Sequence, residues 1–199
     1  MHAPRTLLQM AGAGGAATPL AESTIVIIDA QCEYVTGRVP LHGVEAALDA
    51  IARLLALARR AGAPVIHVVH RGSAGGLFDP LGKMFQIHPK AAPAAGEKII
   101  DKEMPNAFAR TPLHLALRAT GRTSLVLAGF MTHLCVSSTA RAAIDHGWRT
   151  TIVADACTTR DLPCALGGDA IPAATVHRAA LAELADRFAS VARVADLRN

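Results

Sequence analysis

Short apolar runs alternate along this chain with longer stretches in which apolar residues recur at helical spacing. The run from Thr24 to Ile28 is β-branched and apolar throughout, which is typical of a strand buried on both faces of a parallel sheet. We expect further strands at 64–69, 97–101, 124–128, 150–154 and 189–193, and helices at 44–61, 111–119, after residue 132, and at 172–187. This alternation predicts right-handed crossovers and a parallel sheet covered by helices on both faces.

The predicted fold is a three-layer α/β/α domain with a doubly wound six-stranded parallel sheet in the order 3-2-1-4-5-6, the commonest order for six strands. In that order strands one and four are neighbours at the point where the winding reverses, and ligands bind outside the carboxyl ends of the strands there. We expect a single domain over 23–199. Before it, the Ala/Gly-rich segment 1–22 is expected to form an arm, either loose or embracing another subunit.

Composition excludes several classes of partner. The net charge of +4 rests on scattered arginines, without a basic run or interleaved aromatics, so we expect no nucleic-acid binding. No apolar stretch has the length of a signal peptide or a membrane span, so we expect no membrane association and a cytoplasmic location by default. The 4 cysteines form no CxxC pair and no zinc-site spacing, which predicts free thiols.

The segment 125–147 carries the clearest chemical signal. It reads as a buried strand, a glycine-marked turn, and a helix whose first turn holds Cys135. The unpaired N–H groups and partial positive charge of a helix start lower a thiol pKa, which favours a nucleophilic thiolate. Thr132 is a natural N-cap and Gly147 a natural stop. The alternative is a buried cysteine that serves only as a small hydrophobic residue.

Two further groups end neighbouring strands on the same side of the sheet. Asp29 follows the first strand and Lys102 ends the third, so the topology brings both toward Cys135. A carboxylate in a low-dielectric cleft gains basicity, and an ammonium would favour both the carboxylate and a thiolate. Taken singly, Asp29 could be a turn residue and Lys102 a solvated surface lysine.

Four segments, taken together and in order, resemble the isochorismatase-like cysteine hydrolases over about residues 23 to 193. They are IIDAQ (27–31), KEMPNAFART (102–111), GFMTHLCVSSTARAAIDHG (129–147) and TIVADACTTRD (151–161). The resemblance implies a triad of Asp29, Lys102 and Cys135. In such enzymes the cysteine attacks an amide carbonyl, the amine leaves, and water hydrolyses the thioester. The aspartate is the base, and the lysine holds the charges in place.

The resemblance also implies a cis peptide bond between Phe130 and Met131. In that geometry the Met131 and Cys135 N–H groups would face the developing oxyanion. Nicotinamidases of this superfamily place a DxH pair after the second strand, whereas this chain has His70 followed by Arg71 and Gly72. We therefore expect no metal and no cofactor.

The presence of Cys135 favours an amidase acting on a small carboxamide, ureido compound or lactam. The alternatives are an isochorismate-type vinyl-ether hydrolase, which would not need the thiol, and a catalytically silent oligomeric scaffold or thiol sensor. A homo-oligomer is expected, as a dimer, tetramer or octamer.

The remaining candidates concern substrate binding. Four residues are candidates for lining the pocket: Gln31, His70, Phe108 and His133. The alternative for Gln31 is to steady the base, and for His70 it is simply the polarity of a loop. The alternative for Phe108 is core packing, and for His133 it is exposure to solvent. The long segment 71–96, rich in glycine and proline and without periodicity, is expected to form a lid or active-site wall. We interpret Arg160 as structural.

Overall fold

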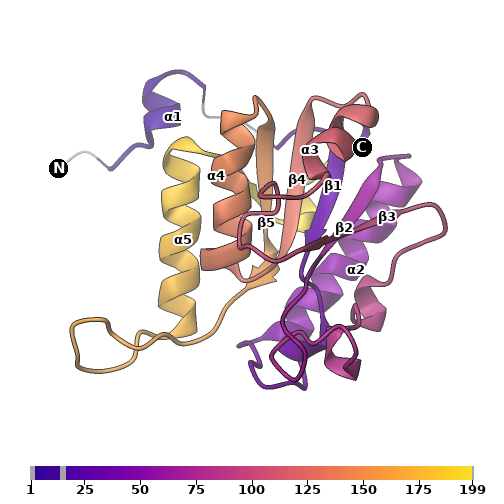
Figure 1. Cartoon of the computed structure of the whole chain (residues 1–199). Helices are drawn as coiled ribbons and strands as arrows, with labels where there is room; N and C mark the ends of the chain where they lie inside the picture. The colour runs from indigo at the N-terminus through magenta and orange to yellow at the C-terminus, as the bar shows by residue number, and fades with distance from the viewer. Residues whose placement is uncertain (1–2, 14–16, 199) are drawn as a thin grey trace.

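The computed structural model describes residues 3–13 and 17–198 and contains one six-stranded parallel sheet in the order β3-β2-β1-β4-β5-β6 (Figure 1). The strands are β1 (Ser23–Ile28), β2 (Val65–His70), β3 (Lys98–Lys102), β4 (Ser124–Phe130), β5 (Arg149–Thr158) and β6 (Ser190–Ala192). The predicted strand order and fold class are confirmed.

Helices cover both faces of this sheet. They are α1 (Leu7–Met10), α2 (Val44–Arg60), α3 (Leu113–Ala119), α4 (Ser137–Asp145) and α5 (Ala173–Arg187). Short helical turns are η1 (Leu20–Glu22), η2 (Cys32–Tyr34), η3 (Lys83–Phe85), η4 (Pro89–Ala91), η5 (Thr132–Val136) and η6 (Val194–Asp196), of which η5 has π pitch. Helix α2 packs in one buried cluster, while α3, α4 and α5 contribute to the cluster on the other face. The result is the three-layer arrangement.

Residues 25–28 of the central strand β1 are apolar because helices cover both faces of the sheet there. Ile25 and Ile27 belong to the cluster under α2, whereas Val26 and Ile28 belong to the cluster under α3 and α4. Because successive side chains point to opposite faces, a strand between two helical layers must be apolar at every such position. β1 pairs with β2 on one side and β4 on the other, so its carboxyl end lies between theirs.

Most predicted elements agree with the structure to within one or two residues, and two differences are larger. Strand β5 continues to Thr158 rather than ending at 154, and its pairing with β4 shifts register between Leu127 and Gly129. The prediction that Thr132 caps a helix is wrong: the chain enters α4 through the π-helical turn η5, and no side-chain cap is made at its start. The hydroxyl of Thr132 instead contacts His177 on α5, so it is not available to cap its own helix.

The described part of the arm lies against the domain. The Leu7 N–H donates to Asp186 Oδ1 of α5 at 2.9 Å, and Leu20 is fully buried, with its N–H bonded to the carbonyl of Arg198. Residues 1–2, 14–16 and 199, which belong to the predicted arm and domain end, lie outside the described residues. None of the helices in 3–13 and 17–198 combines the length and apolarity needed to cross a membrane.

The close approach of β4 to its neighbour β1 predicts that a single methyl group added at Gly129 strongly destabilises the fold. Gly129 has a φ of 119°, and a Cβ there would lie 1.9 Å from the Ile28 carbonyl oxygen. Gly129→Ala should therefore lower the free energy of unfolding by roughly 3 kcal/mol or more. Urea unfolding followed by circular dichroism measures the change.

Gly121→Ala is the matched control. Its φ of 70° is also positive, but a Cβ there meets nothing within 4 Å. That variant should lose only about 1 kcal/mol. Equal losses in the two variants would show that backbone conformation, rather than the close approach of β4 to β1, sets the cost.

Candidate active site

Three polar side chains meet below the carboxyl ends of the strands. Asp29 directly follows β1, Lys102 is the last residue of β3, and Cys135 lies in η5 after β4. Their residues are 0%, 1% and 3% exposed. Lys102 Nζ lies 2.7 Å from Asp29 Oδ2 and donates a hydrogen bond to Cys135 Sγ at 3.2 Å. The structure thus brings the sequence-predicted trio into direct contact.

The ammonium of Lys102 reaches this position across the end of β2. His70 pairs with Lys102 in the β2–β3 register, and Lys102 Nζ lies 3.1 Å from His70 Nδ1. Burial and the nearby positive charge lower the pKa of His70 to about 4, so its ring is neutral and Nδ1 can accept. The ammonium therefore has an ion-pair contact with Asp29 and hydrogen-bond contacts with Cys135 and His70. These three contacts hold Lys102 in place.

Asp29 has the surroundings of a base. Burial raises its pKa above the ordinary 3.8, while the charge and hydrogen bond of Lys102 act in the opposite direction. Its Oδ1 has no hydrogen-bond partner among the described side chains and backbone. The φ of 51° at Asp29 lies in the left-handed region, which aspartate tolerates better than most residues. A buried carboxylate with one open oxygen can take a proton from a neighbouring group.

The protonation state of Cys135 differs from the sequence-based expectation. Burial raises the pKa of the thiol to about 12, the negative charge of Asp29 adds to this effect, and Lys102 only partly opposes it. Burial therefore favours the neutral thiol over the thiolate that the helix start led us to expect. A neutral thiol needs a base, for which Asp29 is the neighbouring candidate, to become a nucleophile.

The backbone before Cys135 is wound tightly. The Phe130–Met131 peptide bond is cis, and the Met131 carbonyl accepts hydrogen bonds from the N–H groups of Leu134 and Val136 at 3.0 and 3.2 Å. Phe130 is fully buried, with its ring 5.9 Å from that of Tyr34. This arrangement ties the nucleophile turn to the end of β4.

Gln31 ties the long loop to the sheet. Its Nε2 donates to the carbonyls of His70 and Phe85 at 3.0 and 2.8 Å, and its Oε1 accepts from the His70 N–H at 2.8 Å. Both amide hydrogens are used and the residue is fully buried. In the structure Gln31 thus anchors segment 71–96 beside the triad, and its substrate-binding role stays a prediction.

The other predicted binding residues lie in different surroundings. The ring of Phe108 lies 4.7 Å from that of His146, at the opposite end of α4 from Cys135, which favours the core-packing alternative. His133 is half-buried next to the nucleophile turn, and its Nδ1 lies 2.5 Å from Thr159 Oγ1. His70 contacts Lys102 as described above.

Arg160, which the sequence analysis interpreted as structural, lies in the same part of the structure as His133. Burial lowers the pKa of His133, and the positive charge of Arg160 adds to this effect. Burial and the negative charges of Asp29 and Cys135 raise the pKa of Tyr34, and the charge of Arg160 partly opposes that rise. Among the described residues no carboxylate lies within ion-pair distance of its guanidinium, which donates only to the Asp161 carbonyl at 3.1 Å. The available signal was its place six residues after the predicted end of β5, on the carboxyl side of the sheet.

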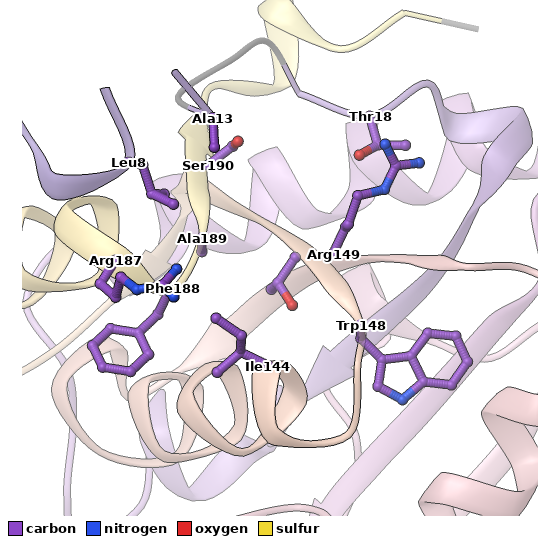
Figure 2. Close-up of a pocket in the computed structure, with 11 residues that line it drawn as sticks. Leu8, Ala13, Thr18, Ile144, Trp148, Arg149, Arg187, Phe188, Ala189 and Ser190 are labelled. Atoms are coloured by element: carbon purple, nitrogen blue, oxygen red, sulfur yellow. The ribbon is translucent and has the colours of Figure 1, made fainter. Parts of the chain in front are cut away.

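Two further features bear on ligands. In residues 3–13 and 17–198 no three His, Cys, Asp or Glu side chains are grouped to hold a metal ion. A cavity of about 380 Å³ lies where β5 and β6 begin, with Leu8, Ile144, Arg149, Phe188 and Ser190 on its walls (Figure 2). That cavity is at the opposite edge of the sheet from the triad, so it is separate from the candidate active site.

The buried ion pair predicts an unusual dependence of stability on pH. In Lys102→Met the Asp29 carboxylate loses its cation, so its pKa in the folded state rises further. The unfolded chain then binds fewer protons than the folded one above pH 3.8, and the free energy of unfolding falls as pH rises. We expect a loss of roughly 3–5 kcal/mol at pH 8, partly recovered at pH 5, by urea unfolding.

Lys98→Met, at the exposed start of the same strand, should change stability little at either pH. An equal loss in Lys102→Met at pH 5 and pH 8 would contradict the account of a buried unpaired carboxylate.

Comparison with known proteins identifies the family. The model of the isochorismatase domain matches residues 23–196. A crystal structure of an isochorismatase from Pseudomonas putida KT2440 superposes with a TM-score of 0.93 at 45% identity, covering 98% of this chain and 100% of that one. The secreted isochorismatase effector Isc1 of Verticillium dahliae is 38% identical over 177 residues, covering 88% of this chain and 90% of that protein.

Maleamate amidohydrolase from Pseudomonas putida is 37% identical over 146 residues, covering 65% of this chain and 68% of that enzyme. The relatives thus include an amide-cleaving enzyme as well as proteins named for isochorismate. With the matched domain spanning most of its length, the chain belongs to the isochorismatase family of hydrolases, as its sequence segments predicted.

Proposed function

We propose that this protein is a cysteine amidohydrolase that cleaves the C–N bond of a small amide, ureido compound or lactam through a thioester intermediate. The observation that carries the proposal is the buried contact of Lys102 Nζ with both Asp29 Oδ2 and Cys135 Sγ, at 2.7 and 3.2 Å. A nucleophile, a base and a fixed cation in one site are the groups that acyl transfer requires.

The proposed reaction begins with proton transfer from the Cys135 thiol to the Asp29 carboxylate as Sγ bonds to the amide carbon. The raised pKa of the thiol makes this transfer necessary, and the raised pKa of Asp29 makes its carboxylate a stronger base. The carbonyl oxygen becomes an oxyanion, for which the Met131 and Cys135 N–H groups are the proposed donors. Asp29 then returns the proton to the nitrogen, the C–N bond breaks, and ammonia or an amine leaves.

The second half repeats the chemistry with water. Asp29 takes a proton from water as its oxygen attacks the thioester carbon, and the C–S bond breaks. The proton passes to the departing sulfur, so the products are a carboxylic acid and the original thiol. Lys102 changes no bond in this scheme; its ammonium offsets whichever of Asp29 and Cys135 carries negative charge.

We further propose that the reaction uses no metal or other cofactor, in keeping with the absence of a DxH pair after β2. A homo-oligomeric state and a cytoplasmic location remain predictions.

A second candidate function is isochorismate-type vinyl-ether hydrolysis, which the likeness to Isc1 favours and which does not need a thiol. A silent scaffold is the third, and it predicts no turnover at all.

Removal of the thiol separates these candidates. Cys135→Ala and Asp29→Asn should each lower kcat for ammonia release from a panel of small amides by about 10³-fold or more. Cys157→Ala, which removes another buried thiol, should retain activity. The assay uses protein dialysed against EDTA, so turnover also tests metal independence.

Ammonia release by Cys135→Ala at the parental rate would refute the thioester route. Turnover of isochorismate that survives this substitution, without amidase activity in the parent, would support the second candidate instead.

The positive charge of Arg160 favours substrates that carry a carboxylate. Arg160 is half-buried without an ion-pair partner among the residues described, and its charge acts on His133 and Tyr34 beside the triad. A cation in this position suits an amide that also carries a carboxylate, because charge-assisted hydrogen bonds are the stronger ones. The likeness to maleamate amidohydrolase supports the same class.

Arg160→Gln tests this assignment. Loss of a charge-assisted bond should raise KM for maleamate about 10-fold or more while KM for the neutral crotonamide changes little. Arg149→Gln, at the opposite edge of the sheet, serves as the control for overall charge. Equal changes of KM for both amides would rule out recognition of the carboxylate by Arg160.

A further inference from the structure

Two threonine–histidine pairs hold the consecutive residues that open the nucleophile turn. Thr132 Oγ1 lies 2.8 Å from His177 Nδ1, and His133 Nδ1 lies 2.5 Å from Thr159 Oγ1. Thr132 is fully buried and His177 is half-buried in the second turn of α5. The first pair therefore links the base of the turn to a helix that carries none of the triad.

Thr132 is the first residue of the turn η5 that carries Cys135. It follows Met131, whose carbonyl accepts the two hydrogen bonds that wind η5, and it precedes Cys135 by three residues. A shift of Thr132 would move the proposed oxyanion donor and the sulfur together. Because its hydroxyl makes no cap to its own helix, its side chain is anchored by α5.

The end of α5 that carries His177 is itself fixed. Asp161 Oδ1 accepts a hydrogen bond from the Ala173 N–H at 2.7 Å, and Leu162 and Ile171 exchange backbone hydrogen bonds beside it. Helix α5 also packs directly on η5. Because the start of α5 is hydrogen-bonded to the segment after β5, His177 has a fixed position from which it can hold Thr132 in place.

On another side His177 borders open space. A cavity of about 240 Å³ is lined by His42, Ala46, Ala47, Asp155, Thr158 and His177. The ring is thus not enclosed by packed side chains on that side, and the bond to Thr132 gives it a defined position. Either neutral tautomer satisfies the contact, because a threonine hydroxyl can donate to or accept from Nδ1.

We propose that His177 is a positioning residue of the amidohydrolase reaction: through Thr132 it fixes the nucleophile turn so that Cys135 Sγ and the Met131 N–H address the same carbonyl group. This inference rests on the proposed function. A purely structural role makes a different prediction, since loss of packing would lower stability without changing kcat of the folded enzyme.

Paired substitutions distinguish the two roles. His177→Ala and Thr132→Val should lower kcat by about 10- to 100-fold with little change of KM, because a displaced nucleophile is penalised in the transition state. His177→Asn, which keeps a polar nitrogen near the place of Nδ1, and Thr132→Ser should stay within about threefold of the parent. The double variant His177→Ala/Thr132→Val should be no slower than either single one, since both remove one interaction.

Chemical rescue uses the adjoining cavity. Added imidazole should restore part of kcat in His177→Ala and none in Thr132→Val. Glu183→Gln is the matched control, because it breaks the Arg141–Glu183 ion pair that joins α4 to α5 at 2.9 Å without touching the turn. Unchanged kcat in His177→Ala despite a lower melting temperature, or an equal kcat loss in Glu183→Gln, would overturn the proposal.

A second readout needs no substrate. Iodoacetamide labelling of Cys135, followed by peptide mass spectrometry, should change by at least about threefold in His177→Ala while labelling of Cys32 does not. If the parent protein releases no ammonia from any amide, the proposed function fails, and labelling alone decides the positioning role. Identical Cys135 labelling in parent and variant would then reject it.

Discussion

The buried ammonium of Lys102 is the interaction on which the arrangement of the site depends. Its side chain has no exposed surface, and a cation removed from water is tolerated only when it is paired and hydrogen-bonded. Asp29, Cys135 and His70 supply three partners, each from the end of a different strand or from the turn that follows it. The ends of β1, β2, β3 and β4 must therefore stay in fixed relation for the ammonium to remain buried.

Much of the fold could be predicted because strand burial dictates composition. A strand covered by helices on both faces favours apolar side chains on both, and β1 shows that pattern over residues 25–28, after the buried polar Ser23 and Thr24. The end of β5 could not be predicted in this way. Residues 155–158 include polar side chains, and the register shift opposite Gly129 depends on β4 rather than on the sequence of β5.

The meeting of Asp29, Lys102 and Cys135 followed from topology, but the electrostatics did not. A helix start favours a thiolate by a modest amount that depends on the sulfur being near free N–H groups and water. Burial works in the opposite direction and with larger magnitude, and sequence gives no measure of it for a single side chain. Gln31 shows the same limit, because its partner Phe85 lies in a loop whose sequence has no periodicity.

Four consecutive residues after the core of β5 illustrate why roles assigned one residue at a time can be wrong. Thr158 Oγ1 donates to the His42 carbonyl, and Thr159 pairs with His133. The charge of Arg160 acts on His133 and Tyr34, and Asp161 accepts a hydrogen bond from the first N–H of α5. Extended backbone turns successive side chains to opposite sides, so neighbours in sequence can contact different elements. Arg160 considered alone resembles a structural residue. Its guanidinium has no ion-pair partner among the described residues, and its proposed role in recognising a substrate carboxylate rests on that feature.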